Sequence, residues 1–290
     1  MAPAPQLLLD DQLDRITLPA IVARLNTMIN DPACSAADIA ETISQDASLS
    51  ARVLRIVNSP FCGLSSQIDN ISMAITLIGT HALRDIIMAT SLIRQFNQFP
   101  EGVVTPQQFW GHNLAVASAA RTLAERLRIV NTERLFIAGL LHDIGKLVMY
   151  LLRPEQSRQV LARAARGKDK LCHIERDVFG IDHGEAGAAL LRQWHMPEAI
   201  IEAVTFHHQP ALANHYVRET GIVHLANAIG NTIEPPISPD DDLSIDTRVW
   251  QMVDLEPTEL VDLTSESQLT LQYALQAMHP ELAQGPSGGD

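Results

Sequence analysis

The chain has 290 residues and a mass of 31.8 kDa, which corresponds to about two domains or one large two-lobed domain. Hydrophobic residues make up 46% and aromatic residues only 4%, which excludes a disordered chain and favours packed helices over a β-sandwich. We find no stretch approaching about 20 consecutive apolar residues and no basic segment at the N-terminus, so we expect neither a membrane span nor a secretory signal.

The net charge of −13 is unevenly distributed along the chain. Residues 232–290 carry 12 acids and one base, whereas residues 1–231 carry 22 acids and 20 bases. Because nucleic acids bind basic surfaces, this distribution argues against direct contact with DNA or RNA. Cys34, Cys62 and Cys172 are too few and too widely spaced for a disulfide framework or a thiolate zinc site, and we predict a cytoplasmic protein.

The first hundred residues show apolar side chains at helical spacing from Leu18-Pro19 onward. Ser35 is a candidate helix cap, and the pattern breaks at Asn58-Ser59-Pro60 before a predicted loop up to Asn70. Two further helices are predicted on either side of Gly79. No alternating strand pattern occurs, so the sequence predicts an all-α protein.

Residues 100–102 mark a boundary, and helical patterns then continue to the C-terminal region. An Ala-rich helix at 106–127 is expected to let neighbouring backbones approach closely. We predict the others at 132–140, 155–166, 171–178, 184–193, 197–206, 215–229, 257–263 and 266–278. Residues 234–239 are rich in proline and predict a linker, and the Gly-rich C-terminal end predicts a mobile tail.

Five of the eleven histidines stand out by their sequence context: His112, His142, His183, His207 and His208. The first four are 30, 41 and 24 residues apart, so only the packing of several helices can bring them together. Imidazole and carboxylate groups bind first-row divalent metals, and Asp143 follows His142 directly. A carboxylate can bridge two metals about 3.5–4 Å apart. Lys146 could then add positive charge for a phosphate group.

A hydrogen-bonded cluster with a purely structural role stays open as an alternative, because buried polar networks also collect histidine and aspartate. A single His-Asp pair is common by chance, so the prediction depends on the whole ordered set. The role of His224, near Asn227, is left open. No role is predicted for the remaining histidines, His81, His173, His195, His215 and His279.

The ordered histidines and the segment His142-Asp143-Ile144-Gly145-Lys146 resemble the ligand set of the HD superfamily of metal-dependent phosphohydrolases. The upstream segment resembles a narrower group, the HDOD (HD-related output domain) proteins. The segments that carry this resemblance are Leu18-Pro19, 45–49, 53–59, 74–79, 109–112, His183 with Gly187, and 190–197.

The resemblance implies a two-lobed helical module. We expect a tail at 1–15, an N-terminal helical lobe at 16–100, an HD-like lobe at 101–231 and an acidic extension at 232–290. It also implies a bacterial signalling module that acts through a signalling protein partner. A metal-dependent phosphohydrolase acting on a nucleotide or other phosphoester is the alternative, with Asp143 and Lys146 as catalytic residues.

The implied metal ligands are His112, His142, Asp143, His183, His207, His208 and Asn227, and the implied metal is a divalent ion such as Fe, Mn, Ni, Zn or Mg.

The chain departs from the catalytic pattern of the family in two places. The first is Asn227, where HD enzymes have an aspartate. The Gly-Tyr-Pro element of enzymes that cleave cyclic di-GMP is absent after His207-His208, and this disfavours that activity. A small phosphorylated ligand is the second partner that the resemblance implies.

Overall fold

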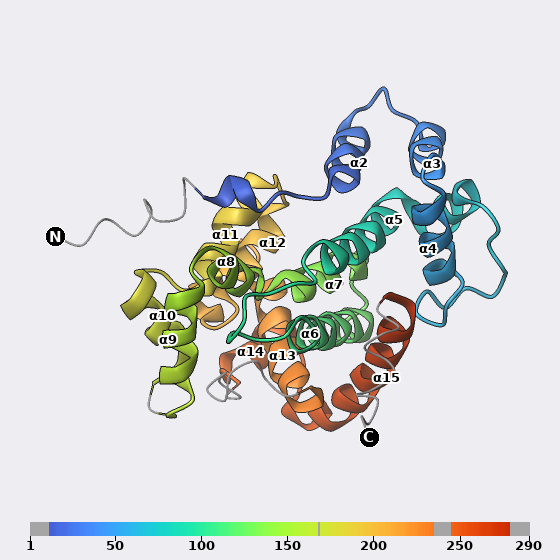
Figure 1. Ribbon diagram of the computed structural model, residues 1–290. Coiled ribbons are helices and arrows are strands. Elements are labelled where there is room, and N and C mark those ends of the chain that lie inside the picture. Colours follow the sequence, from blue (N-terminus) through green and yellow to red (C-terminus); the bar gives the residue numbers. More distant parts are fainter. Residues whose placement is uncertain (1–11, 168, 235–244, 279–290) are drawn as a thin grey trace, which may run out of the picture. The chain divides into compact units, whose positions relative to one another are not determined.

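A computed structural model describes residues 12–167, 169–234 and 245–278 (Figure 1). The chain is 73% helical and has no strand in these ranges, which confirms the all-α prediction. Its residues group into two compact units. Unit 1 comprises the described residues of Met1–Thr17 and Asn97–Leu271, and unit 2 those of Leu18–Phe96 and Gln272–Asp290. The sequence-based domain boundaries stay a prediction.

Unit 2 is built around one long helix, α5 (Ile71–Gln95), which packs against three shorter helices. These are α2 (Ala20–Asn30), α3 (Ala36–Ser44) and α4 (Ala47–Val57). Ser35 caps α3 as predicted, because its hydroxyl accepts the Asp38 amide proton while the Asp38 carboxylate accepts that of Ser35.

The two helices predicted on either side of Gly79 are present, and they follow each other within α5 across a kink at this residue. Gly79 has φ 84° and ψ 163°, a conformation that costs other residues considerable strain. The glycine therefore interrupts the helical backbone and changes its direction, as the sequence predicts.

The loop between α4 and α5 is fastened by the side chain of Asn58. Its amide donates to the Ile68 carbonyl at 2.7 Å and accepts the Ile68 N–H at 2.7 Å. We expect N58A to lower the free energy of unfolding by about 2 to 3 kcal/mol, because it leaves buried backbone groups of Ile68 without partners. Urea unfolding tests this against N30A, which removes one exposed hydrogen bond. Equal destabilisation by N58A and N30A would contradict the role of Asn58 in holding the loop between α4 and α5.

Unit 1 contains the remaining helices, arranged around α6 (Pro106–Arg126) and α13 (Val217–Ile233), which pack against each other. The others are α7 (Thr132–Leu141), α8 (Ile144–Leu152), α9 (Pro154–Ala164), α10 (Leu171–Phe179), α11 (His183–Gln193), α12 (Glu198–Phe206), α14 (Arg248–Val253) and α15 (Leu260–Met278), with α15 extending into unit 2. The one-turn 3-10 helices are η1 (Leu13–Arg15), η2 (Pro210–Leu212) and η3 (Pro257–Glu259).

Small residues set the close spacing of these helices. A Cβ atom at Gly139 would lie 2.8 Å from the Ala117 Cα, and one at Gly230 would lie 2.6 Å from the Val116 Cγ2. Both contacts are made with α6, so the Ala-rich helix does permit the predicted close approach of its neighbours.

The C-terminal segment is part of the core of unit 1. Val249, Val253 and Leu263 are buried in the same hydrophobic cluster as Val116 and Ile229. Outside this cluster, the Arg126 guanidinium pairs with Glu259 at 2.8 Å and with Glu266 at 2.7 Å. The helices predicted at 257–263 and 266–278 prove to be a single helix, α15, preceded by η3, and α14 was not predicted. The predicted linker beyond Glu234, the mobile tail and most of the N-terminal tail lie outside the described residues.

Two helical stretches are long and apolar enough to cross a membrane by length and composition, Ile71–Gln95 and Thr132–Leu152. This differs from the sequence expectation that no stretch approaches that length. The second stretch contains the break between α7 and α8, and 89% of its most apolar window is buried. Buried core helices pass the same test, so these stretches are weak evidence for a membrane span.

Candidate metal centre

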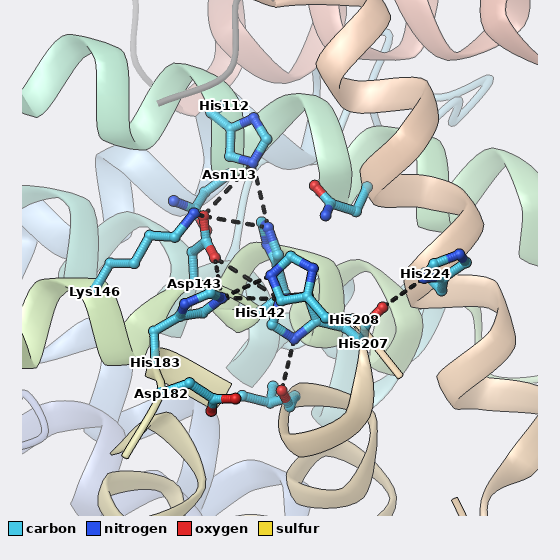
Figure 2. A network of polar contacts seen from close by, with 12 residues as sticks. His112, Asn113, His142, Asp143, Lys146, Asp182, His183, His207, His208 and His224 are labelled. Atoms are coloured by element: carbon cyan, nitrogen blue, oxygen red, sulfur yellow. Dashed lines mark hydrogen bonds and ion pairs between the residues drawn. The ribbon is translucent and has the colours of Figure 1, made fainter. Parts of the chain in front are cut away.

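The histidines singled out in the sequence converge in unit 1 (Figure 2). His112 lies on α6, His183 begins α11, and His207-His208 follow the end of α12. His112, His142, Asp143, Lys146, His183 and His207 are all at most 2% exposed, and His208 is half-buried. The structure therefore brings the spaced histidines and the aspartate into one buried cluster.

Asp143 lies at a break between α7 and α8, with φ −100° and ψ 12°. Within one regular helix, the side chains of the adjacent His142 and Asp143 would lie about 100° apart around the axis. The helix ends instead at Leu141, and a new one begins at Ile144. This break presents the Asp143 carboxylate to histidines from several helices.

Each oxygen of the Asp143 carboxylate faces a different pair of imidazoles. Asp143 Oδ2 lies 3.6 Å from the Nε2 of His112 and 3.4 Å from that of His142. Asp143 Oδ1 lies 3.4 Å from the Nε2 of His183 and 3.9 Å from that of His207. One carboxylate thus stands between two sets of nitrogen donors.

We call His112, His142 and Asp143 the His112 set, and His183, His207 and His208 the His183 set. The ligand atoms within each set lie within 4.8 Å of one another. The His183 Nε2 is 2.9 Å from that of His208 and 3.2 Å from that of His207.

The opposite ring nitrogens of three histidines fix their tautomers. His142 Nδ1 lies 2.8 Å from the Gly139 carbonyl oxygen, and His207 Nδ1 lies 2.7 Å from that of Val204. His183 Nδ1 lies 2.6 Å from the Glu175 carboxylate. Since these partners accept protons, each Nδ1 carries the hydrogen. The lone pair is then on Nε2, which faces the centre of the cluster, as in metal-ligating histidines.

The Asp143 carboxylate is buried and poorly satisfied by the described residues. Its Oδ2 lies 2.9 Å from the Lys146 ammonium, yet neither oxygen accepts a well-oriented hydrogen bond. Buried charged oxygens normally have such partners, because the loss of hydration is costly. A cation between the two sets would coordinate these carboxylate oxygens in place of the missing hydrogen-bond donors. The donor set therefore fits one or two divalent metals.

Burial keeps most of these imidazoles neutral at physiological pH. It lowers the pKa of His112 and His142 to about 4. Burial and neighbouring imidazoles also lower the pKa of His207 and His208 well below the ordinary value. Because a metal binds the neutral ring, these four histidines are in the required state at pH 7.

Asp143 and His183 differ from these four histidines, because nearby charges outweigh the effect of burial on their pKa values. Burial alone would raise the pKa of Asp143, but the adjacent His142 and the Lys146 ammonium lower it well below its usual value, so the carboxylate is ionised. Burial alone would lower the pKa of His183, but the charge of Glu175 outweighs it and raises that pKa.

Glu175 was not identified from the sequence. It lies on α10, is 3% exposed, and also accepts the His183 backbone N–H at 3.0 Å. No regular spacing connects it to His183, because the two residues belong to different helices. Its carboxylate orients the His183 ring and increases the basicity of Nε2.

We expect E175Q to lower metal affinity by about 10- to 100-fold, because it removes the charge behind His183. Isothermal titration with Mn²⁺ or Zn²⁺ measures this directly. The matched control is D177N, which removes the same charge from α10 at an exposed ion pair with Arg163. Unchanged affinity in E175Q would show that Glu175 does not tune the ligand.

Asn227 lies on α13 and is 5% exposed. Its amide oxygen is 3.5 Å from the Asn231 Nδ2. Its assignment as a metal ligand stays a prediction.

The helical fold and the buried cluster define a class of protein: an all-α module with a histidine and aspartate donor set suited to divalent metals. The family model for the HDOD domain matches residues 16–210, and the chain belongs to this family. The match ends before α13, so His224 and the C-terminal helices lie beyond it.

Two crystal structures share the fold over most of both chains. A Shewanella amazonensis protein provisionally named a phosphohydrolase is 25% identical, with a TM-score of 0.69, covering 91% of this chain and 98% of that one. A Geobacter sulfurreducens HDOD domain protein of unknown function is also 25% identical, with a TM-score of 0.67 and coverages of 92% and 91%. An uncharacterised protein of Treponema pallidum is 27% identical over 203 residues, and the match spans 68% of this chain and 38% of that relative's length.

Proposed function

We propose that this chain is a regulatory signalling module of the HDOD type that retains a divalent metal at the His112 and His183 sets. The observation that carries the proposal is the Asp143 carboxylate, which is buried, ionised and placed between converging imidazole nitrogens. Imidazole donors suit Fe, Ni or Zn better than Mg, which prefers oxygen ligands. Such an ion would hold together donor residues from α6, from the break between α7 and α8, from the start of α11 and from the end of α12.

Burial favours a regulatory role over turnover. The donor residues other than His208 are at most 2% exposed, so a phosphoester has little access to them. A retained metal would instead stabilise one arrangement of α6, α8, α11 and α12, and a signalling protein partner would recognise that arrangement. The acidic charge of the chain also disfavours nucleic acid as the partner.

The test compares metal-loaded chain, metal-free chain and a metal-free variant as baits for a bacterial signalling protein. The variant is D143N/K146M, which removes both buried charges together. The proposal expects capture of a defined partner by the loaded chain only, with a dissociation constant that rises when the metal is removed. Capture that is equal in all three samples, or the absence of any partner together with phosphoester turnover, would contradict the proposal.

Lys146 supports the alternative, a metal-dependent phosphohydrolase. Its buried ammonium lies 2.9 Å from Asp143, where it could stabilise the charge of a phosphate group. Under this alternative, the loaded chain hydrolyses bis-p-nitrophenyl phosphate or p-nitrophenyl phosphate, and K146M abolishes turnover while metal content stays unchanged. The name of the Shewanella relative is consistent with this candidate. Cyclic di-GMP hydrolysis stays disfavoured, since the Gly-Tyr-Pro element is absent.

A further inference from the structure

His224 lies at the edge of the cluster (Figure 2), and its contact with Asp246 connects the cluster to the C-terminal segment. It is on α13, one turn before Asn227, and is 8% exposed. Its Nδ1 lies 2.6 Å from the carbonyl oxygen of His207, and its Nε2 lies 3.1 Å from the backbone nitrogen of Asp246.

The chemistry of the two partners fixes the state of this ring. A carbonyl oxygen only accepts, so His224 Nδ1 carries a hydrogen and donates it to His207. A backbone amide only donates, so His224 Nε2 is unprotonated and accepts from Asp246. The ring therefore forms both bonds as one neutral tautomer, which connects two backbone groups that are 39 residues apart in the sequence.

The carbonyl that His224 holds belongs to the peptide bond between His207 and His208. This peptide lies just past the end of α12, where the final helical carbonyls lack intrahelical donors. Rotation of the peptide plane would turn the two rings relative to each other. Their centroids are now 4.1 Å apart, and both Nε2 atoms point to His183.

Asp246, at the other end of this hydrogen-bonded connection, is also held in place by its neighbours. Asp246 accepts the Arg248 N–H at 3.0 Å, immediately before α14. Val249 and Val253 of α14 are fully buried, and a Cβ atom at Gly221 of α13 would lie 3.1 Å from the Val253 Cγ1. A displacement of α14 would therefore act on His224 through the Asp246 amide.

We propose that His224 is a positioning residue that holds the His207–His208 peptide and couples the geometry of the His183 set to the segment that begins at Asp246. This inference rests on the proposed metal site, because it describes how that site is regulated. A partner that displaces α14 would thereby loosen the His183 set while the His112 set stays in place.

The test uses four variants. H224A removes both bonds, whereas H224N keeps an amide donor on the γ-carbon that can still reach the His207 carbonyl. D246P removes the backbone N–H that His224 accepts, and D246A is its matched control because both variants lose the Asp246 carboxylate. H215A controls for the loss of an exposed histidine in the same region.

The first readout is the ¹⁵N imidazole NMR spectrum of the metal-free chain, which does not depend on metal binding. H224A is expected to shift or broaden the ring signals of His207 and His208 while those of His112 and His142 stay in place. H224N should restore the His207 and His208 signals in part, and H215A should leave them unchanged. Unchanged His207 and His208 signals in folded H224A and H224N would overturn the positioning role.

The second readout is Co²⁺ affinity measured by titration. We expect a loss of about 10- to 100-fold in H224A, a smaller loss in H224N, and weaker binding in D246P than in D246A. Equal affinity in D246P and D246A would overturn the coupling to the C-terminal segment. If the wild-type chain binds no metal although His207 responds to H224A in the NMR spectrum, the proposed metal site fails and the positioning role stands.

Discussion

Replacing Gly145 with alanine is expected to disrupt the cluster more than adding a methyl group at any other glycine for which the contacts of a Cβ atom are known. A Cβ atom at this position would lie 1.8 Å from the His183 carbonyl oxygen and 2.7 Å from the Gly187 nitrogen. Both are backbone atoms of α11, so the overlap cannot be relieved by a side-chain rotation. The helix α11 must move away from α8, and His183 moves with it away from Asp143.

We expect G145A to lower the free energy of unfolding by about 3 kcal/mol, at the upper end for overpacking in a core, and to weaken metal binding. Urea unfolding and metal titration measure the two effects. The control is G111A, next to His112, where an added Cβ meets no atom within 4 Å. That variant should be as stable as the wild type or slightly more stable. A wild-type unfolding midpoint and affinity in G145A would contradict the observed packing.

Changing Asp143 to asparagine is expected to affect both stability and metal content. Asparagine keeps the shape but removes the charge that faces Lys146 at 2.9 Å and the four imidazoles of His112, His142, His183 and His207. Removing one partner of a buried ion pair commonly costs about 3–5 kcal/mol. We therefore expect a destabilised fold and the loss of bound metal in D143N.

The double variant D143N/K146M separates these two effects. Removing both charges should recover most of the stability, because no buried ammonium then faces the neutral amide. Metal content should stay as low as in D143N, since the carboxylate that lies between the two sets is missing. Recovery of metal content in the double variant would contradict the role of Asp143. Wild-type chain that holds no metal, with the same pattern of stabilities, would support the structural-cluster alternative.

The sequence was sufficient to predict which histidines come together, because their order and context are specific even though the intervals between them are long. It was also sufficient for the helical class and for local features such as the Ser35 cap. The helix break that places Asp143 between the two sets was not predicted, and neither was α8, because no helix was predicted between residues 140 and 155. Glu175 and the His224 contact to the His207 carbonyl depend on helix packing and leave no local pattern.

The helices of the C-terminal region also could not be predicted correctly from local sequence patterns. The helix α14 is six residues long, too short for a recognisable periodicity, and its burial depends on Gly221 of α13. The apolar residues of α15 appeared as two patterns because Thr264 and Ser265 lie between them. In the structure, the hydroxyls of these two residues bond to carbonyls four residues earlier, and the helix continues.

Metal content of the purified chain tests the central claim most directly. The chain is stripped with a chelator, reconstituted separately with Fe²⁺, Mn²⁺, Ni²⁺ and Zn²⁺, dialysed, and analysed by mass spectrometry of the elements. We predict that at least one of these metals is retained at about one to two ions per chain, as the two donor sets allow, and that D143N/K146M retains none. Folded wild-type chain that retains no ion under any of these conditions would contradict the account.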